Sequence, residues 1–145
     1  MLLAIDVSAA APEQKLLSFL DAVSEQAALI WDRGCLIGGL ASEMAAVNPL
    51  LRGHVSRMFT EMAHALEPLA EPFVASLAGH HLDAAALAEH FLVVVEGAVV
   101  MSRAHGDPQR ISQAVARLAA FLRSLPRKSQ FLAKKPPKSR SKLPR

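Results

Sequence analysis

The sequence predicts an all-α protein, and three observations lead to that prediction. Alanine and leucine, which lose little conformational freedom in a helix, supply 26 and 21 of the 145 residues. Apolar residues recur every three or four positions along most of the chain, as on one face of a helix. Glycines, prolines and helix-capping residues divide this pattern into segments. With 52% hydrophobic and 20% charged residues, the chain can bury one core, so we expect a single bundle of about five helices.

The first expected helix begins at Pro12, whose fixed φ suits a first helical position, and continues to about residue 30. Its buried face would carry apolar residues three or four positions apart: Leu16, Leu20, Val23, Ala27 and Ile30. The second expected helix extends from about Cys35 to Val47. Its Gly38-Gly39 pair costs about 1 kcal/mol per residue relative to alanine, which is tolerable where another backbone or a ligand must approach closely.

The third expected helix opens with Asn48 as its N-cap and Pro49 as its first residue. It carries the longest apolar stripe in the chain, at spacings of three and four: Leu51, Val55, Met58, Met62, Leu66, Leu69, Phe73 and Leu77. Pro68 and Pro72 interrupt the backbone hydrogen bonds of a helix, so we expect a kink or a break after about Glu67.

The fourth expected helix follows the N-cap Asp83 and extends from Ala84 to Ala104. It is apolar on nearly every side, which is typical of a helix at the centre of a bundle or in a subunit interface. His105-Gly106 ends it, and Asp107-Pro108 starts the fifth helix. That last helix carries a seam suited to pairing with another helix: Ile111, Val115, Leu118, Leu122 and Leu125.

The last twenty residues, 126–145, differ from the rest of the chain in charge. They hold eight lysines and arginines, four of the nine prolines and no acidic residue, so residues 1–125 keep eight basic residues against all thirteen acidic ones. Such a segment buries too little apolar surface to offset its chain entropy, and we expect a disordered basic tail. The acidic body is not attracted to phosphate backbones.

Cysteine usage and hydropathy indicate the compartment. The single cysteine excludes an internal disulfide and fits a reducing environment. The most apolar run, Phe91–Met101, contains Glu96 and is shorter than the roughly 18 residues that span a bilayer. We therefore expect a cytoplasmic protein with no membrane contact.

Catalytic and metal-binding motifs are not found. The sequence has no phosphate-binding loop, nucleophile elbow or zinc-protease motif, and His80-His81 has no cysteine or acid at ligand spacing. We expect no enzyme and no cofactor. Two side chains are unusual. Cys35 lies at a helix N-terminus, which would lower its thiol pKa; the alternative for Cys35 is a small buried hydrophobic residue. Glu96 is an acid in the most apolar helix, so it must be paired, protonated or facing a wet cavity.

Residues 33–43, Arg-Gly-Cys-Leu-Ile-Gly-Gly-Leu-Ala-Ser-Glu, resemble the Gly-Cys-Leu-x-Gly-Asn-Leu-x-x-Glu helix in the C-terminal region of many TetR-family transcriptional regulators. The order that follows is also similar. Asn48-Pro49 opens a long helix, Glu96-Gly97-Ala98 lies in an apolar penultimate helix, and a short turn, 105–108, opens the last helix. The resemblance covers residues 12–125, and Gly39 replaces the commoner asparagine.

The resemblance implies an all-helical domain over residues 12–125, preceded by a linker or remnant over 1–11, that binds a small hydrophobic effector and forms a homodimer through its last two helices. It implies a pocket among the second, third and fourth helices, with this expected lining: Cys35, Gly39, Met58, Met62, Phe91, Val95 and Glu96. The implied dimer interface contains Ala98, Met101, Ile111, Val115, Leu118 and Leu122. An apolar pocket with one acid would suit a hydrophobic or weakly cationic effector, and Cys35 is a candidate electrophile sensor.

The family reads DNA through an N-terminal three-helix unit, but here only eleven residues precede Pro12. We therefore expect that this chain reaches DNA only through a missing N-terminal domain and does not recognise an operator by itself. The alternative function is a helical interaction protein. It would dimerise, or form heterodimers with full-length relatives, while its basic tail contacts nucleic acid or an anionic surface.

Overall fold

The computed structural model of the chain describes residues 10–79 and 82–128. Within these ranges the chain forms six α-helices after one short 3₁₀ turn, and its β-type contacts are limited to a single bridge between Leu77 and Arg127. The elements are η1 (Pro12–Gln14), α1 (Lys15–Glu25), α2 (Ala27–Arg33), α3 (Leu36–Met44), α4 (Pro49–Ser76), α5 (Ala84–His105) and α6 (Gln109–Ser124). The all-α prediction is confirmed.

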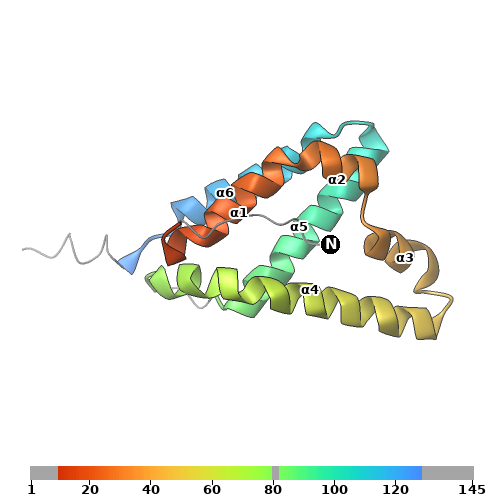
Figure 1. Cartoon of the computed structure of the whole chain (residues 1–145), viewed down its shortest axis with the longest axis horizontal. Helices are drawn as coiled ribbons and strands as arrows, with labels where there is room; N and C mark the ends of the chain where they lie inside the picture. Colours follow the sequence, from red (N-terminus) through yellow and green to blue (C-terminus); the bar gives the residue numbers. More distant parts are fainter. Residues whose placement is uncertain (1–9, 80–81, 129–145) are drawn as a thin grey trace, which may run out of the picture.

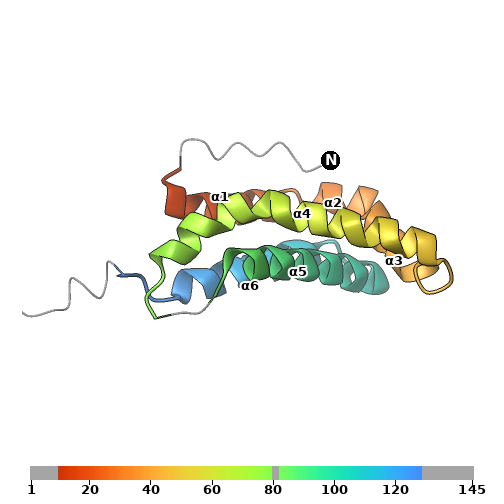
Figure 2. The ribbon, with the colours of Figure 1, turned by 90° about the horizontal axis from the view of Figure 1, so that it is seen from below.

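The helices form two layers, which Figure 2 shows edge on: α1, α2 and α4 lie in one layer, and α5 and α6 in the other. α5 crosses the molecule diagonally in Figure 1 and packs against both α4 and α6. α6 also packs along α1, which closes the bundle. α3 connects the end of α2 to the start of α4 at one end of the molecule.

Two clusters of buried apolar side chains hold these layers together. The larger draws on α1, α4, α5 and α6, and its fully buried members include Leu20, Phe73, Val115 and Leu122. The smaller consists of Ala27, Ala98, Val99 and Ile111, with Trp31 packed against it. Burying a leucine, valine or phenylalanine side chain stabilises the fold by about 1.5–3 kcal/mol, so the larger cluster dominates.

The first predicted helix is divided in two, which gives six helices in place of about five. Gln26 leaves helical geometry at φ −91° and ψ 12°, and its N–H is shared between the carbonyls of Ala22 and Val23. This one-residue interruption redirects the chain so that Ala27 joins the smaller cluster and not the larger one. The residues around it are good helix formers, so tertiary packing causes the interruption and propensity does not.

α3 is shorter than predicted and buries none of its residues. Cys35 is its N-cap, and the Cys35 Sγ accepts a hydrogen bond from the Gly38 N–H at 3.4 Å. The helix ends at Met44, three residues before the expected Val47. Leu36 is 77% exposed and Val47 75% exposed, so the apolar stripe of this helix faces solvent in the isolated chain.

α4 begins as predicted, because the Asn48 side chain accepts a hydrogen bond from the Leu51 N–H at 3.0 Å and Pro49 is the first helical residue. The predicted break is wrong: the helix continues for 28 residues through Pro68 and Pro72 to Ser76. Each proline lacks a backbone N–H donor and crowds the preceding turn, yet the helix is continuous here, where Leu66, Ala70 and Phe73 are buried in the larger cluster. The expected bend is visible in Figure 2, where the ribbon of α4 curves along its proline-containing half.

Both ends of α5 agree with prediction to within one residue. The Asp83 carboxylate accepts a hydrogen bond from the Ala86 N–H at 2.6 Å, and Gly106 ends the helix in the left-handed conformation at φ 62°. By length and composition alone α5 could cross a membrane, with a mean hydropathy of 1.8. The core helix of a soluble protein passes the same test, and α5 packs between α4 and α6.

The last described residues, 126–128, pack against the C-terminal end of α4. The Arg127 guanidinium lies 4.2 Å from the centroid of the Phe73 ring and donates a hydrogen bond to the Ser76 Oγ. Lys128 donates a hydrogen bond from its Nζ to the Ala75 carbonyl at 2.7 Å. The first three residues of the expected tail therefore contact the body. Residues 129–145, where the rest of that prediction falls, lie outside the described residues, as do 1–9 and 80–81.

Candidate functional site

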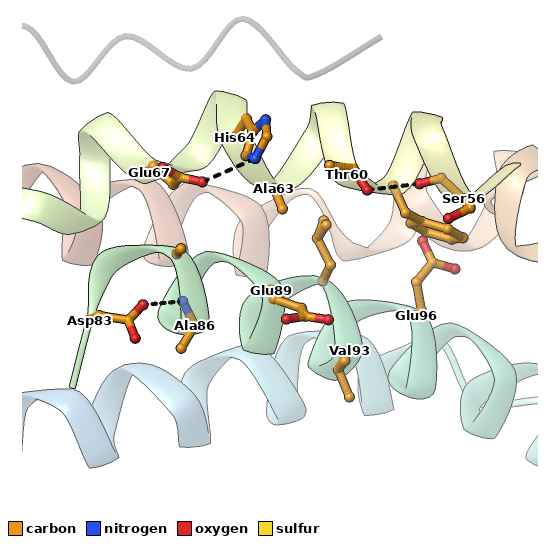
Figure 3. A pocket seen from close by; sticks show the side chains of 13 residues that line it. Ser56, Thr60, Ala63, His64, Glu67, Asp83, Ala86, Glu89, Val93 and Glu96 are labelled. Atoms are coloured by element: carbon orange, nitrogen blue, oxygen red, sulfur yellow. Dashed lines mark hydrogen bonds and ion pairs between the residues drawn. The ribbon is translucent and has the colours of Figure 1, made fainter. Parts of the chain in front are cut away.

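A long groove of about 740 Å³ separates α4 from α5 (Figure 3). One wall comes from α4 and the other from α5 and the residue that caps it. The lining residues are Ser56, Phe59, Thr60, Ala63, His64, Glu67, Asp83, Ala85, Ala86, Glu89, Leu92, Val93 and Glu96. α4 and α5 pack against each other along this line, so a molecule in the groove would contact both helices.

The groove combines apolar walls with carboxylates. Three apolar residues of the lining also belong to the core or touch it. Leu92 is part of the larger cluster, and Phe59 and Ala63 pack partly buried against that cluster. Four acids line it, Glu67, Asp83, Glu89 and Glu96, while lysine and arginine are absent from the described lining. The only ion pair among the described groove residues joins His64 Nε2 to Glu67 Oε1 at 3.7 Å. The groove is therefore a site of net negative charge.

One end of the groove meets the start of α3 at Glu96. Figure 3 shows the Glu96 side chain pointing from α5 toward α4. A Cβ placed on Gly38 would collide with the Glu96 Oε2, so the glycine leaves the room that this carboxylate occupies. The group that approaches Gly38 is thus a side chain and not the expected backbone or ligand, and nothing lies within 4 Å of a Cβ placed on Gly39. None of the ion pairs among the described residues involves Glu96.

The Cys35 thiol, which lies beside Glu96 at this end of the groove, has a pKa shift opposite to the expected one. Burial raises the pKa of the Cys35 thiol, and the hydrogen bond and negative charge of Glu96 raise it further. The Gly38 N–H, which stabilises the thiolate, opposes these effects but is outweighed. The prediction of a lowered thiol pKa at this helix N-terminus is therefore wrong, because burial and the facing Glu96 outweigh the effect of the helix end.

Of the seven side chains expected to line a pocket, the structure places only Glu96 in the groove lining. Phe91 is buried in the larger cluster, where its ring meets that of Phe19 edge to face with centroids 5.5 Å apart. Met62 and Val95 pack partly buried against that cluster, and Met58 is 43% exposed. Cys35 lies beside Glu96, at the edge of the site. Met62 belongs to the core-facing side of α4, whereas the groove uses the adjacent side of that helix.

The groove residues that the sequence analysis missed form a second stripe. On α4 they are small or polar and recur at helical spacing: Ser56, Thr60, Ala63, His64 and Glu67. On α5, Glu89 and Glu96 lie seven residues apart, so they share a face of the helix. Acids repeated on one face of a strongly apolar helix were the signal that could have found this groove.

The residues expected at a dimer interface are mostly buried within the chain. Five of its six residues, Ala98, Ile111, Val115, Leu118 and Leu122, are buried inside the chain, because the seam of α6 packs against α1 and α5. Only Met101 is exposed, at 50%. The exposed apolar residues of this layer are instead Val93, Val100 and Met101 on α5 and Phe121 on α6.

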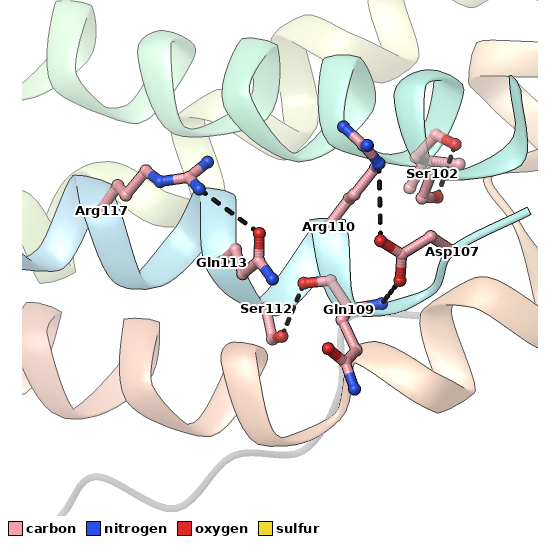
Figure 4. Close-up of polar contacts among 8 residues, drawn as sticks. Ser102, Asp107, Gln109, Arg110, Ser112, Gln113 and Arg117 are labelled. Atoms are coloured by element: carbon pink, nitrogen blue, oxygen red, sulfur yellow. Dashed lines mark hydrogen bonds and ion pairs between the residues drawn. The ribbon is translucent and has the colours of Figure 1, made fainter. Parts of the chain in front are cut away.

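The adjoining face of α6 carries polar side chains (Figure 4). Arg117 hydrogen-bonds to Gln113 at 3.3 Å, and the Nε of Arg110 lies 3.5 Å from the Asp107 carboxylate. Asp107 also accepts a hydrogen bond from the Gln109 N–H at 3.0 Å, so it caps α6 as predicted, although the helix itself starts at Gln109. The outer surface of the α5–α6 layer is therefore apolar along α5 and mixed along α6.

Metal ligands do not gather in the described part of the chain, where no group of three or more histidine, cysteine, aspartate or glutamate side chains could hold an ion. The adjacent histidines of the sequence, 80–81, lie outside the described residues. The arrangement offers a groove, an acidic lining and an exposed apolar helix face.

Comparison with known proteins identifies the domain. A family model described as the Tetracyclin repressor-like, C-terminal domain matches residues 12–119, which is most of the folded body. No curated protein and no solved structure matches the chain. The match begins at Pro12, where the first turn of the structure begins, and it covers every helix from α1 through most of α6. The chain therefore belongs to the TetR family of transcriptional regulators, of which it carries the regulatory C-terminal domain.

Proposed function

We propose that this chain is the effector-binding and dimerisation domain of a TetR-type transcriptional regulator, and that the groove between α4 and α5 is its effector site. The groove is the observation on which the proposal depends. Its volume of about 740 Å³ is within the range of pockets that hold drug-sized molecules, roughly 300–1,000 Å³. Family membership supports a regulatory role over an enzymatic one.

The lining suggests the class of effector. Apolar contact with Phe59 and Leu92 favours a hydrophobic molecule, and four carboxylates around it favour a positive charge. An aromatic ring such as that of Phe59 also attracts a cation that lies over its face. A hydrophobic organic cation therefore fits the site better than a neutral or anionic molecule of the same size.

Effector binding would act through α5, which serves two surfaces. Its groove side contacts the effector, while Val100 and Met101 on its exposed side form an apolar face suited to a second copy of the chain. Val93 lines the groove and is also 62% exposed, so it lies where the two surfaces meet. A molecule that separates α4 from α5 would change the position of the helix that carries the dimer face.

Tetraphenylphosphonium, a hydrophobic organic cation, provides a direct test by isothermal titration calorimetry. Thr60→Trp places a large side chain in the groove from an exposed position, and Gln113→Trp makes the same change on the outer face of α6. We expect binding to the unmodified chain and to Gln113→Trp, and loss of binding in Thr60→Trp. Equal binding to both variants would exclude the groove, and equal binding of neutral triphenylphosphine oxide would exclude the charge preference.

Dimerisation has a separate test by sedimentation equilibrium. Val100→Asp introduces a charge on the exposed face of α5, and Val47→Asp introduces one at an even more exposed apolar position outside that face. We expect the chain and Val47→Asp to be dimers and Val100→Asp to be a monomer. A monomeric unmodified chain at micromolar concentration would contradict the dimer.

A further inference from the structure

We propose that the groove between α4 and α5 binds the chain's own C-terminal segment, residues 129–145, which competes there with a cationic effector. The docking itself follows from the groove and from the position at which the segment leaves the body. Only the competition rests on the function proposed above. The two parts are tested separately below.

Charge complementarity is the first argument. Glu67, Asp83, Glu89 and Glu96 line the groove, and the described lining contains no lysine or arginine to balance them. Residues 129–145 contain six lysines and arginines and no acidic residue. Opposite charges held on one chain attract each other at close range, and a groove with apolar walls strengthens the attraction because it screens charge less than open water does.

The starting point of the segment is the second argument. Pro126 accepts a hydrogen bond from the Ala78 N–H at 3.0 Å, Arg127 packs on Phe73, and Lys128 bonds to the Ala75 carbonyl. These contacts fix residue 128 at the C-terminal end of α4. Glu67, the acidic groove residue on α4, lies eight positions before Ala75 in that helix, which corresponds to about 12 Å along the helix axis.

The length and order of the segment fit this distance. An extended chain covers at most about 3.3–3.6 Å per residue, so Lys134 and Lys135 can lie up to roughly 20–25 Å from Lys128. The whole segment can extend up to roughly 56–61 Å, which is sufficient to reach Glu96 at the far end of the groove. Phe131 and Leu132 precede the two lysines, so apolar side chains and then positive charges would enter a groove that offers Phe59 and Leu92 beside carboxylates.

Tethering makes a weak interaction sufficient. A segment attached near its binding site experiences an effective concentration on the order of millimolar, so it occupies the site even when the same peptide, free in solution, would bind poorly. An effector would then have to displace it, and the apparent Kd of the effector rises in inverse proportion to the fraction of time that the groove is free.

The docking can be tested on the full chain by paramagnetic relaxation enhancement. Ser139→Cys in a Cys35→Ser background provides one attachment site for a spin label, and serine at position 35 can still cap α3. We expect the label to broaden the methyl resonances of Ala63 and Ala86, which line the groove, more than that of Ala114 on α6. Equal broadening at all three positions would overturn the proposal.

Matched charge variants make this test specific. Glu67→Gln/Glu89→Gln removes two charges from the groove and should abolish the excess broadening, as should salt at about 0.5 M, since ions screen exposed charges. Glu25→Gln/Glu43→Gln removes two exposed acids outside the groove and should leave it unchanged. Equal loss in both variants would overturn groove docking. A mixture of spin-labelled chains and chains without the label separates docking within one chain from docking between chains. Broadening in the chains without the label would show that the segment docks on a second copy, which would overturn docking within one chain.

Competition is measured by titrating tetraphenylphosphonium into the full chain and into Lys134→Glu/Lys135→Glu. If the segment occupies the groove for about 90% of the time, its release should tighten binding about tenfold. Unchanged affinity would overturn the competition, even where the label shows docking. Absence of binding in both proteins would contradict the proposed effector class and leave the relaxation result to decide the docking.

Discussion

α3 and α6 differ more in their surroundings than in their sequence patterns. Both carry apolar residues at helical spacing: Leu36, Leu40 and Met44 in α3, and Ile111, Val115, Leu118 and Leu122 in α6. In α6 the pattern is buried, with Ile111, Val115 and Leu122 at most 1% exposed. In α3 no residue is buried, and Leu36 is 77% exposed. Helical periodicity therefore predicts which side of a helix is apolar, but not what covers that side.

The anchoring of the two helices differs in the same way. α6 is bonded to α1 by the ion pair between Arg123 and Asp21 and by the hydrogen bond from Ser24 Oγ to the Ser112 carbonyl, in addition to its buried side. α3 buries no residue and contacts α4, and two glycines at its start leave room for side chains of α5: Gly38 in the helix approaches Glu96, and Gly34, just before the helix, approaches Arg103. Stability in α6 comes from buried area, and position in α3 comes from backbone shape.

The largest effect is expected for Leu122→Ala in α6. The side chain is 1% exposed, and truncating a buried leucine costs about 2–5 kcal/mol in the free energy of unfolding. Phe121→Ala is the control. The Phe121 side chain, next to Leu122 in the sequence, is 56% exposed, so its truncation should cost far less. Urea unfolding of both variants measures the difference. Equal costs would contradict the burial that distinguishes α6 from α3.

A smaller loss of stability is expected just before α3, where the substitution adds a side chain and does not remove one. Gly34 has φ 65° and ψ −171°, a backbone region open essentially to glycine only, and a Cβ there would meet the Arg103 guanidinium. Gly34→Ala should therefore cost about 1–3 kcal/mol. Gly39→Ala, in open space inside the helix, should stabilise by up to about 1 kcal/mol. Thermal unfolding that shows the same sign for both would contradict the role of backbone shape in this region.

The thiol of Cys35 tests the contact between α3 and α5. Because burial and then Glu96 raise its pKa above the ordinary value of 9.0, Glu96→Gln should lower the pKa and speed alkylation by iodoacetamide at a fixed pH. Glu89→Gln, on the same helix, should leave the rate unchanged. The raised pKa also determines how the free energy of unfolding depends on pH. As the pH rises past the ordinary pKa, the thiol of the unfolded chain loses its proton first. The Cys35 thiol therefore destabilises the fold increasingly until the pH passes the pKa of the folded state. A faster rate in both variants would place Glu96 away from the thiol.

The smallest effect is expected for Leu36→Ala in α3. Its side chain is exposed, and surface substitutions of this kind usually change the free energy of unfolding by no more than about 0.5 kcal/mol. A cost near that of Leu122→Ala would show that something covers the apolar side of α3 in solution. Unfolding measured over a range of protein concentrations would then show whether a second copy supplies that cover.

Helix boundaries were predictable where a single residue decides them through a local bond. Asn48, Asp83 and Asp107 each accept a hydrogen bond from a backbone N–H two or three positions later, and Gly106 supplies a left-handed end. The interruption at Gln26 was not predictable, because its cause is packing against residues more than seventy positions away. The continuity of α4 through two prolines has the same origin.

The site was less predictable than the fold. Met58 and Met62, two residues of the longest apolar stripe of α4, were expected to line a pocket, but such a stripe is what a core requires, and the structure uses most of it there. A groove between two helices is lined by residues at the edge of the apolar side, where small and polar side chains leave space. Glu96 was identified because an acid in an apolar helix needs an explanation wherever it lies.

The interruption at Gln26 also separates α1 from α2, and the two helices should differ in the free energy of local unfolding. α1 contributes five buried side chains, whereas α2 contributes Ala27 alone, to the smaller cluster. Local unfolding begins where the fewest apolar contacts must be broken. Backbone amides of α2 should therefore exchange with deuterium before those of α1, and a protease should cut the chain between Gln26 and the start of α4 before it cuts elsewhere in the described body.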